Sequence, residues 1–194
     1  MDSAAPADIL AFWFGRTGEP GFGQPRGEWF RKDAGFDDQI RSRFQPGVEA
    51  ALAGQLAAWA ADRQGAFALL ILLDQFPRNL FRGEAKAFAG DPQARQLAET
   101  ALAKGWDRGL SAVEKLFIYL PFEHSEALAD QERSVALFSA LAAEHPGCDG
   151  FLDYAHRHHE VIARFGRFPH RNAALGRPST PEETSYLAQP GSGF

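Results

Sequence analysis

The chain has 194 residues and a mass of 21.3 kDa, enough for one domain or two small ones that bury about 70% of the unfolded surface. Hydrophobic residues make up 45% of the sequence and charged residues 23%, a composition that excludes wholesale disorder and collagen-like architecture. The net charge of −5 argues against general binding of nucleic acid, and the single cysteine, Cys148, excludes an intrachain disulfide.

The same features predict where the protein resides. A single cysteine fits a reducing compartment, so we expect a cytoplasmic protein. The longest apolar run, 66–73, is far shorter than the roughly 20 residues that span a bilayer. Asp2 and Asp8 stand where a signal peptide would carry positive charge. The sequence therefore predicts neither export nor contact with a membrane.

Proline and glycine divide the chain into segments whose apolar residues recur at helical spacing. Residues 6–14 predict a first helix with an aromatic face that packs in the core and ends at Gly15. A loop-rich segment follows over 16–34. The next helix, 36–54, is expected to kink or break near Pro46, because proline removes a backbone donor.

The central segment, 66–75, is apolar on nearly every face and predicts a buried helix that Phe76 and Pro77 end. Asp91 and Pro92 predict the next start, with Asp91 as the N-cap. The next helices are expected to span 91–105, to run from the capping box at 111–114 to Pro121, and to span about 128–143. Another is expected to run from the turn at 147–150 to Gly166, and the last to begin at Thr180 with Glu183 completing a capping box.

This pattern predicts an all-α protein of antiparallel helix pairs, packed as a compact bundle or a short solenoid. We expect one all-helical domain over 1–194, with an irregular C-terminal segment over 168–194. One partial echo stands out, since Phe76-Pro77-Arg78-Asn79 returns in part as 168–172. The two corresponding helix ends are therefore expected to be related in structure.

The densest polar segment is 164–177, which holds four arginines and His170 in a chain that is acidic overall. Guanidinium groups form bidentate hydrogen bonds with carboxylates and phosphates, so this segment predicts an anion site formed by side chains. The alternative is structural: arginine and asparagine cap the preceding helix and pair with acidic residues elsewhere.

Two further segments join carboxylates to cations or histidines. Asp74 lies in the most buried helix, so it must face a cavity or meet a cation such as Arg78. In 121–126, Glu123 and Glu126 flank His124. A nearby carboxylate can shift the pKa of a histidine across the neutral range, which suits general acid or base catalysis, although such residues also cap helices.

A histidine-rich helix segment, 156–160, offers weak metal-binding spacing. His156 lies on one face with His159 and with Glu160, at distances of three and four residues. A zinc site would need a third ligand from elsewhere, and the His-Glu-x-x-His arrangement is absent from the sequence. No metal site and no cofactor are predicted.

Four motifs together resemble the bacterial family of uncharacterised proteins called DUF924, and they lie at 9–15, 73–79, 121–126 and 165–172. The resemblance covers nearly the whole chain in order. It implies a tetratricopeptide-like, right-handed arrangement of helix pairs, and it implies little about function. The family pattern places its histidine at His158 rather than at His156 or His159, which weakens the chelation argument.

These observations lead to one hypothesis with three alternatives. We expect the polar side chains at helix ends to converge on one pocket that binds an anionic small molecule or a carboxylate-bearing partner, because isolated buried charges are costly. The catalytic candidates are His124, Glu123 and His170. The ligand-binding candidates are Asp74, Arg78, Asn79, Glu126, His158, Arg167, Arg171 and Asn172.

The first alternative is an enzyme of hydrolase or isomerase type, in which a histidine and a glutamate transfer protons and arginines stabilise negative charge. The second is a peptide-binding helical-repeat scaffold. The third is that the polar motifs only hold helix ends together. The charge and the motifs predict no nucleic-acid partner, and the oligomeric state is left open.

Overall fold

The computed structural model describes residues 4–193, so residues 1–3 and 194 of the expected single domain lie outside the described residues. The described residues form helices, turns and loops without a strand, and the all-α class is confirmed. None of the helices in this part of the chain combines the length and the apolar character needed to cross a membrane. The tetratricopeptide-like superhelix stays a prediction.

The chain divides into two compact units. Unit 1 comprises the chain up to Arg82 together with Lys86–Pro121, and unit 2 comprises Gly83–Ala85 together with the chain from Phe122 onward. The single domain expected from the sequence stays a prediction.

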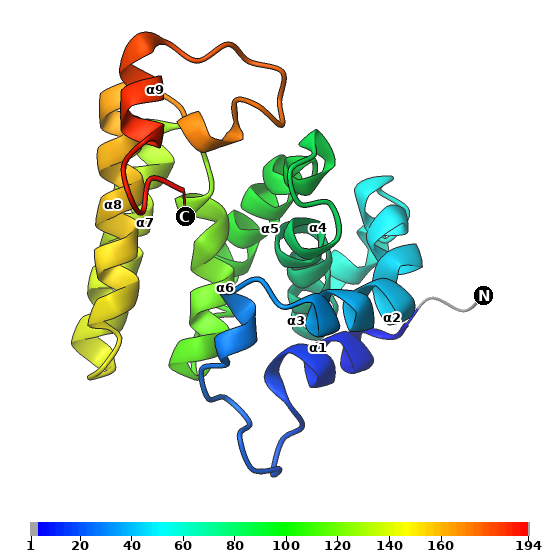
Figure 1. Cartoon of the computed structure of the whole chain (residues 1–194). Coiled ribbons are helices and arrows are strands. Elements are labelled where there is room, and N and C mark those ends of the chain that lie inside the picture. Colours follow the sequence, from blue (N-terminus) through cyan, green and yellow to red (C-terminus); the bar gives the residue numbers. More distant parts are fainter. Residues whose placement is uncertain (1–3, 194) are drawn as a thin grey trace. The chain divides into compact units, whose positions relative to one another are not determined.

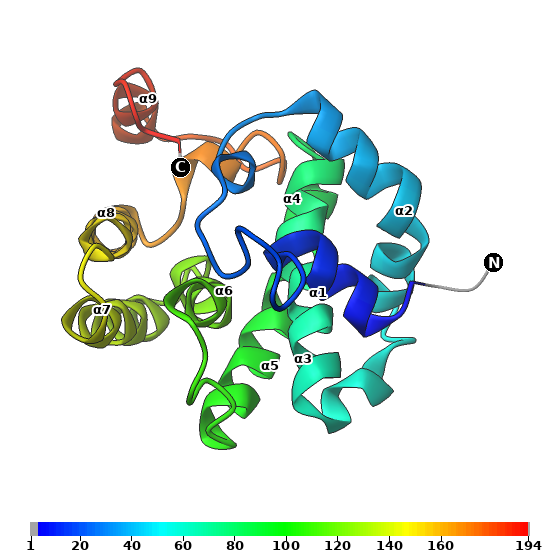
Figure 2. The ribbon, with the colours of Figure 1, turned by 90° about the horizontal axis from the view of Figure 1, so that it is seen from below.

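Unit 1 is built around one long helical element (Figures 1 and 2). This element consists of α3 (Arg63–Leu70), a π turn (Ile71–Gln75) and α4 (Phe76–Leu80). Figure 2 shows it at the centre of the unit, and the helices that pack against it are α1 (Pro6–Phe14), α2 (Ala34–Leu52) and α5 (Asp91–Ala103). The unit also contains the short 3₁₀ turns at Gly27–Trp29 and Ala57–Ala61, and the larger parts of the 3₁₀ turn at Ala85–Phe88 and of α6 (Ala112–Glu123).

The core of unit 1 is aromatic, as the first helix predicts. Trp13 is fully buried, and its ring lies 5.6 Å from that of Trp29, 5.6 Å from that of Phe76 and 5.3 Å from that of Phe117. These offset and edge-on contacts are the arrangements that aromatic rings prefer. The backbone of α1 then stops at Gly15, whose φ of 86° lies in the region that favours glycine.

Proline marks fewer helix ends than the sequence predicts. The helix α2 continues through Pro46, and α6 continues through Pro121. The expected end at Phe76 and Pro77 is also wrong, because the amide of Phe76 bonds to the carbonyl of Ile71 in a π turn. The wider turn changes the hydrogen-bond register just where Pro77 lacks an N–H, so the helical path continues into α4.

The start of α5 also differs in detail from the sequence prediction. Gly90, not Asp91, is the N-cap, and Asp91 is the first helical residue. Gly90 packs against the π turn so closely that a Cβ atom there would lie 2.2 Å from the carbonyl oxygen of Leu73. Close packing therefore requires glycine at the cap. The Asp91 carboxylate accepts hydrogen bonds from Arg78 instead of capping the helix.

Unit 2 consists of α7 (Leu128–Glu144), α8 (Asp149–Phe165) and α9 (Pro181–Leu187), with a 3₁₀ turn at Pro169–Arg171 (Figure 1). A short turn joins α7 to α8, which pack side by side as an antiparallel pair. Gly166, with φ of 69°, ends α8 in the left-handed conformation and turns the chain toward the 3₁₀ turn. The predicted capping box at Thr180 and Glu183 is confirmed at the start of α9.

Candidate functional site

The polar motif of unit 1 surrounds Asp74 in the π turn. Asp74 is 1% exposed, and its carboxylate lies 3.4 Å from a guanidinium nitrogen of Arg78, the cation named from the sequence. The same guanidinium donates two hydrogen bonds, of 2.8 and 3.0 Å, to the carboxylate of Asp91. Burial alone would lower the pKa of Arg78, but the charges of Asp74 and Asp91 raise it above its ordinary value. Arg78 is thus held between two carboxylates.

Asn79 belongs to a second contact group in unit 1. Its amide donates a hydrogen bond of 2.7 Å to Asp37 at the start of α2, and Arg82 donates two more, of 2.9 and 3.0 Å, to the same carboxylate. Asp37 is 8% exposed, so its three hydrogen bonds offset the cost of burying the charge. These contacts tie α2 to the end of α4.

In unit 2 the sequence candidates gather around the buried ring of Phe168. The ring centroids of His158 and His170 each lie 5.5 Å from that of Phe168, and the guanidinium carbon of Arg171 lies 4.6 Å from it. The ring of His124 lies 6.5 Å from that of His158. We call His124, His158, His170 and Arg171 the histidine–arginine cluster.

Backbone geometry explains how the cluster forms. His124 follows the last turn of α6, and its carbonyl accepts a hydrogen bond of 2.9 Å from Arg171. Gly166 turns the chain after α8, so that His170 and Arg171, in the 3₁₀ turn, return toward His158 on α8. Residues that lie 47 positions apart in the sequence therefore meet at one place in unit 2.

His158 is the buried member of the cluster and is held from two sides. Its Nδ1 lies 2.9 Å from the carbonyl oxygen of Tyr154 and 3.3 Å from a carboxylate oxygen of Glu123. Both neighbours accept hydrogen bonds, so Nδ1 carries the proton and Nε2 is the acceptor nitrogen. Burial is the main cause that lowers the pKa of His158, to about 3; the hydrogen bond to Tyr154 opposes it, the charges of His124, His170 and Arg171 add to it, and the imidazole is neutral near pH 7.

Glu126 anchors the 3₁₀ turn. Its carboxylate accepts a hydrogen bond of 2.7 Å from the backbone amide of Phe168 and two, of 2.7 and 2.9 Å, from Arg177. Burial raises the pKa of Glu126, but the hydrogen bonds from Arg177 and from the amide outweigh it and hold the pKa below its ordinary value. These contacts fix the backbone beside the cluster.

Arg167 and Asn172 share a buried carboxylate, Glu183 of α9. Arg167 donates hydrogen bonds of 2.6 and 2.8 Å to it, and Asn172 donates one of 3.3 Å. The amide of Thr180 donates another, of 2.7 Å. The bonds from Arg167, followed by that of Thr180, lower the pKa of Glu183 to about 2. This group holds α9 against the segment that carries the cluster.

Comparison with known proteins agrees with the fold. Residues 9–191 match a family model described as a bacterial protein of unknown function, DUF924. The chain belongs to the DUF924 family. It is also similar to a solved structure of a protein of unknown function from Agrobacterium tumefaciens, with 42% identity and a TM-score of 0.81. The match covers 94% of this chain and 96% of that one. No curated protein matches the chain.

The DUF924 motifs thus separate by unit. Asp74, Arg78 and Asn79 belong to unit 1, and the other candidates belong to unit 2. Within unit 2 the structure brings together His124, His158, His170 and Arg171, with Glu123 on His158. The hypothesis that all the candidates form one pocket stays a prediction.

Sequence reasoning missed the acidic partners in this DUF924 chain. No local pattern marks Asp37 as the partner of Asn79 and Arg82, which lie 42 and 45 positions away. The sequence identifies Glu183 only as a capping-box residue. Its carboxylate also accepts hydrogen bonds from Arg167 and Asn172. A glutamate two residues after a first-turn proline signals the cap, but it carries no signal for partners 11 and 16 positions away.

Among the described residues, no group of three or more His, Cys, Asp or Glu side chains is positioned to hold a metal ion.

Proposed function

We propose that the protein binds a small anionic molecule, carrying a carboxylate or a phosphate, at the histidine–arginine cluster of unit 2. The observation that carries the proposal is the gathering of cation-capable groups around one ring: His158 and His170 lie 5.5 Å from the ring of Phe168, Arg171 lies 4.6 Å from it, and His124 lies 6.5 Å from His158. Imidazolium and guanidinium groups donate strong, charge-assisted hydrogen bonds to such ligands.

The residues around the cluster have supporting roles in this proposal. Arg171 is 6% exposed and is fixed by the carbonyl of His124, which limits the entropy lost when it meets a ligand. His124 and His170 are half-buried, so they are the members that meet a ligand from solvent. Glu123 acts as a positioning residue, because it fixes the ring of His158.

Acid–base catalysis is the second candidate, and the contact between Glu123 and His158 favours it. A carboxylate that holds Nδ1 leaves Nε2 to accept a proton, as general bases do. Catalysis at neutral pH, however, works best with a pKa near the operating pH, and the pKa of His158 is about 3. Binding therefore ranks above catalysis for this site.

The test is calorimetric titration of the full chain with acetate and with inorganic phosphate at pH 6 and pH 8. We expect acetate, whose charge is constant over this range, to bind more tightly at pH 6, where histidines take up protons more readily. His124→Gln and His170→Gln should each weaken binding by about tenfold, since a hydrogen bond to a charged group contributes about 1.5–3 kcal/mol. His156→Gln is the matched control, because His156 lies exposed on α8.

Two results would overturn the proposal. One is the absence of any phosphate or acetate binding at either pH. The other is binding that the His156 variant weakens as much as the His124 and His170 variants do. Arg171→Lys keeps the positive charge and controls for a folding defect in Arg171→Ala. The lysine variant should retain weak binding, whereas the alanine variant should lose binding.

A further inference from the structure

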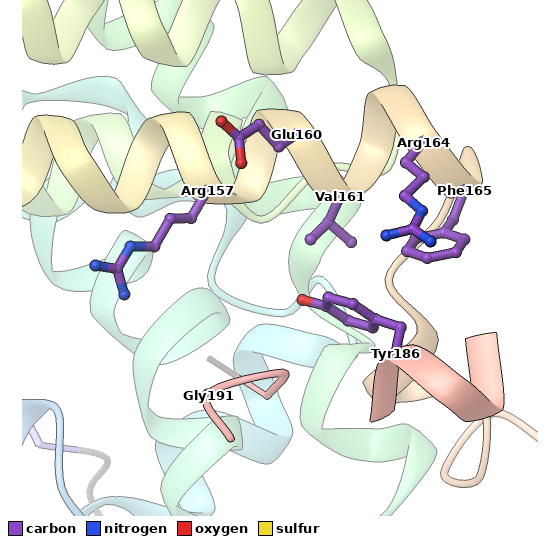
Figure 3. Close-up of a pocket in the computed structure, with 7 residues that line it drawn as sticks. All are labelled: Arg157, Glu160, Val161, Arg164, Phe165, Tyr186 and Gly191. Carbon is purple, nitrogen blue, oxygen red and sulfur yellow. The ribbon is translucent and has the colours of Figure 1, made fainter. Parts of the chain in front are cut away.

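A pocket of about 210 Å³ lies along α8 in unit 2, beside α9 and the chain that follows it (Figure 3). Its lining includes Arg157, Val161, Arg164, Phe165, Tyr186 and Gly191. Glu160 of α8 also lines it (Figure 3). Pockets for drug-sized ligands begin at about 300 Å³, so this one suits a smaller metabolite.

The pocket places one arginine at each end of an apolar floor. Arg157, Val161 and Arg164 are four and three residues apart, so they share one face of α8. At 1.5 Å of rise per residue, the two arginine Cα atoms are separated by roughly 10 Å along the axis. In Figure 3 both side chains project from the side of α8 that faces Tyr186 and Gly191, with Val161 between them.

Both arginines have internal partners that an incoming anion can replace. Arg157 pairs with Asp153 at 2.7 Å, and Arg164 pairs with Glu182 at 2.8 Å. All four side chains are more than half exposed. Exposed ion pairs of this kind contribute little to stability. Exchanging a carboxylate of the protein for one of a ligand therefore costs little.

The wall between the arginines is aromatic. The ring of Tyr186 lies 5.2 Å from that of Phe165 and is tilted by 52° to it, and both rings line the pocket together with Val161. Burial raises the pKa of the Tyr186 phenol, against a smaller opposite effect of Arg164, so the hydroxyl stays protonated and can donate a hydrogen bond. Such a wall favours a planar ring over a bare anion.

We propose that this pocket binds a small aromatic molecule with an anionic group at each end, one on Arg157 and one on Arg164. The aromatic body lies on Val161 and against Tyr186. The site is separate from the histidine–arginine cluster, because no cluster residue lines it. It also differs in its cations, which are two exposed guanidiniums.

The test compares benzene-1,4-dicarboxylate with benzoate, which has the same ring and one carboxylate, by calorimetric titration of the full chain. The dicarboxylate should bind about tenfold more tightly, as expected for one additional charge-assisted pair. Arg157→Ala and Arg164→Ala should each reduce its affinity to that of benzoate. Arg133→Ala removes an exposed arginine from α7 of the same unit and should change nothing.

One further variant distinguishes binding from mere surface charge. Glu182→Gln removes the internal partner of Arg164 but keeps the guanidinium, so it should tighten dicarboxylate binding. Equal affinity for the two ligands, or no binding of the dicarboxylate, would overturn the inference. Loss of binding in His170→Gln with retention in Arg164→Ala would also overturn it, by assigning the dicarboxylate to the cluster. Phosphate binding to the cluster is measured independently, so either proposal can fail alone.

Discussion

The segments Phe76–Asn79 in unit 1 and Phe168–Asn172 in unit 2 have similar sequences, and each is held by an asparagine hydrogen bond to a carboxylate. The residues around the two segments differ. Each ends in an asparagine that donates to a buried carboxylate, and an arginine shares that carboxylate. In unit 1 the remaining arginine, Arg78, is held between two aspartates. In unit 2 the corresponding position, Arg171, lies with histidines around one ring.

The comparison separates two uses of the same side chains. An arginine between carboxylates fixes helices in place, whereas an arginine grouped with imidazoles gathers donors for an anion. The backbone differs as well, since the first segment continues a helix through a π turn and the second follows a left-handed glycine stop. The similarity in sequence thus predicts the asparagine hydrogen bond but not the neighbours of the arginine.

The largest expected effect comes from breaking the packing beneath the first segment. Gly90→Ala would place Cβ 2.2 Å from the backbone oxygen of Leu73, and backbone atoms of a buried helix cannot move aside cheaply. We expect the free energy of unfolding to fall by about 3 kcal/mol, as for a severe case of overpacking. Urea-induced unfolding measures it.

Gly150→Ala is the matched control for that variant. Gly150 lies in the first turn of α8, and no atom lies within 4 Å of the added Cβ. This substitution should raise stability by about 0.5–1 kcal/mol, because alanine is the better helix former. If Gly90→Ala proved as harmless as the control, the close contact between α5 and the π turn would be refuted.

The next largest effect concerns the asparagine hydrogen bond in unit 1. Asp37→Ala leaves the buried amide of Asn79 without its carboxylate and should cost about 1–3 kcal/mol. The neighbouring Asp38 has an 80% exposed side chain that lies 4.0 Å from Arg41, so Asp38→Ala should change stability by less than about 0.5 kcal/mol. Chemical denaturation of the two variants gives the comparison, and equal losses would contradict it.

The sequence predicts the helical class and most helices from local signals. Caps at Ser111 and Thr180 and the glycine stops carry local signals, because their hydrogen bonds span only a few residues. The π turn carries no such signal, since it depends on packing against Gly90 and the neighbouring helices. Likewise, Asp37 and Glu183 meet partners far along the chain, and only the folded backbone brings them together.

The Glu183 carboxylate in unit 2 should appear in the acid dependence of stability. The pKa of Glu183 is about 2 in the folded protein, compared with about 4.5 for an ordinary glutamate. Between these values the unfolded chain binds a proton that the folded chain does not, so this contribution is present above pH 4.5 and is lost as the pH falls toward 2. Glu183→Gln should flatten the curve of unfolding free energy in this range. An unchanged slope would contradict the assignment.

The prediction most specific to the cluster concerns the protonation of His158. Its pKa of about 3 in the folded state lies below the ordinary 6.5, so the unfolded chain binds the additional proton between these values. Stability that depends on neutral His158 is therefore complete above pH 6.5 and declines as the pH falls toward 3. The His158 and Glu183 contributions decline in the same direction, but the histidine contribution begins to decline about two pH units earlier.

Nuclear magnetic resonance can follow His158 directly. Its ring carbon-bound protons should keep constant chemical shifts from pH 8 to pH 5, because burial and the charges around it keep the ring neutral. Glu123→Gln supplies the matched perturbation, since it removes the carboxylate at 3.3 Å while the carbonyl of Tyr154 still holds Nδ1. Without that negative charge the pKa should fall further, so the shifts should again stay constant. Titration of His158 near pH 6.5 would show that the ring is not buried among cationic neighbours, and the cluster would then lose its central member.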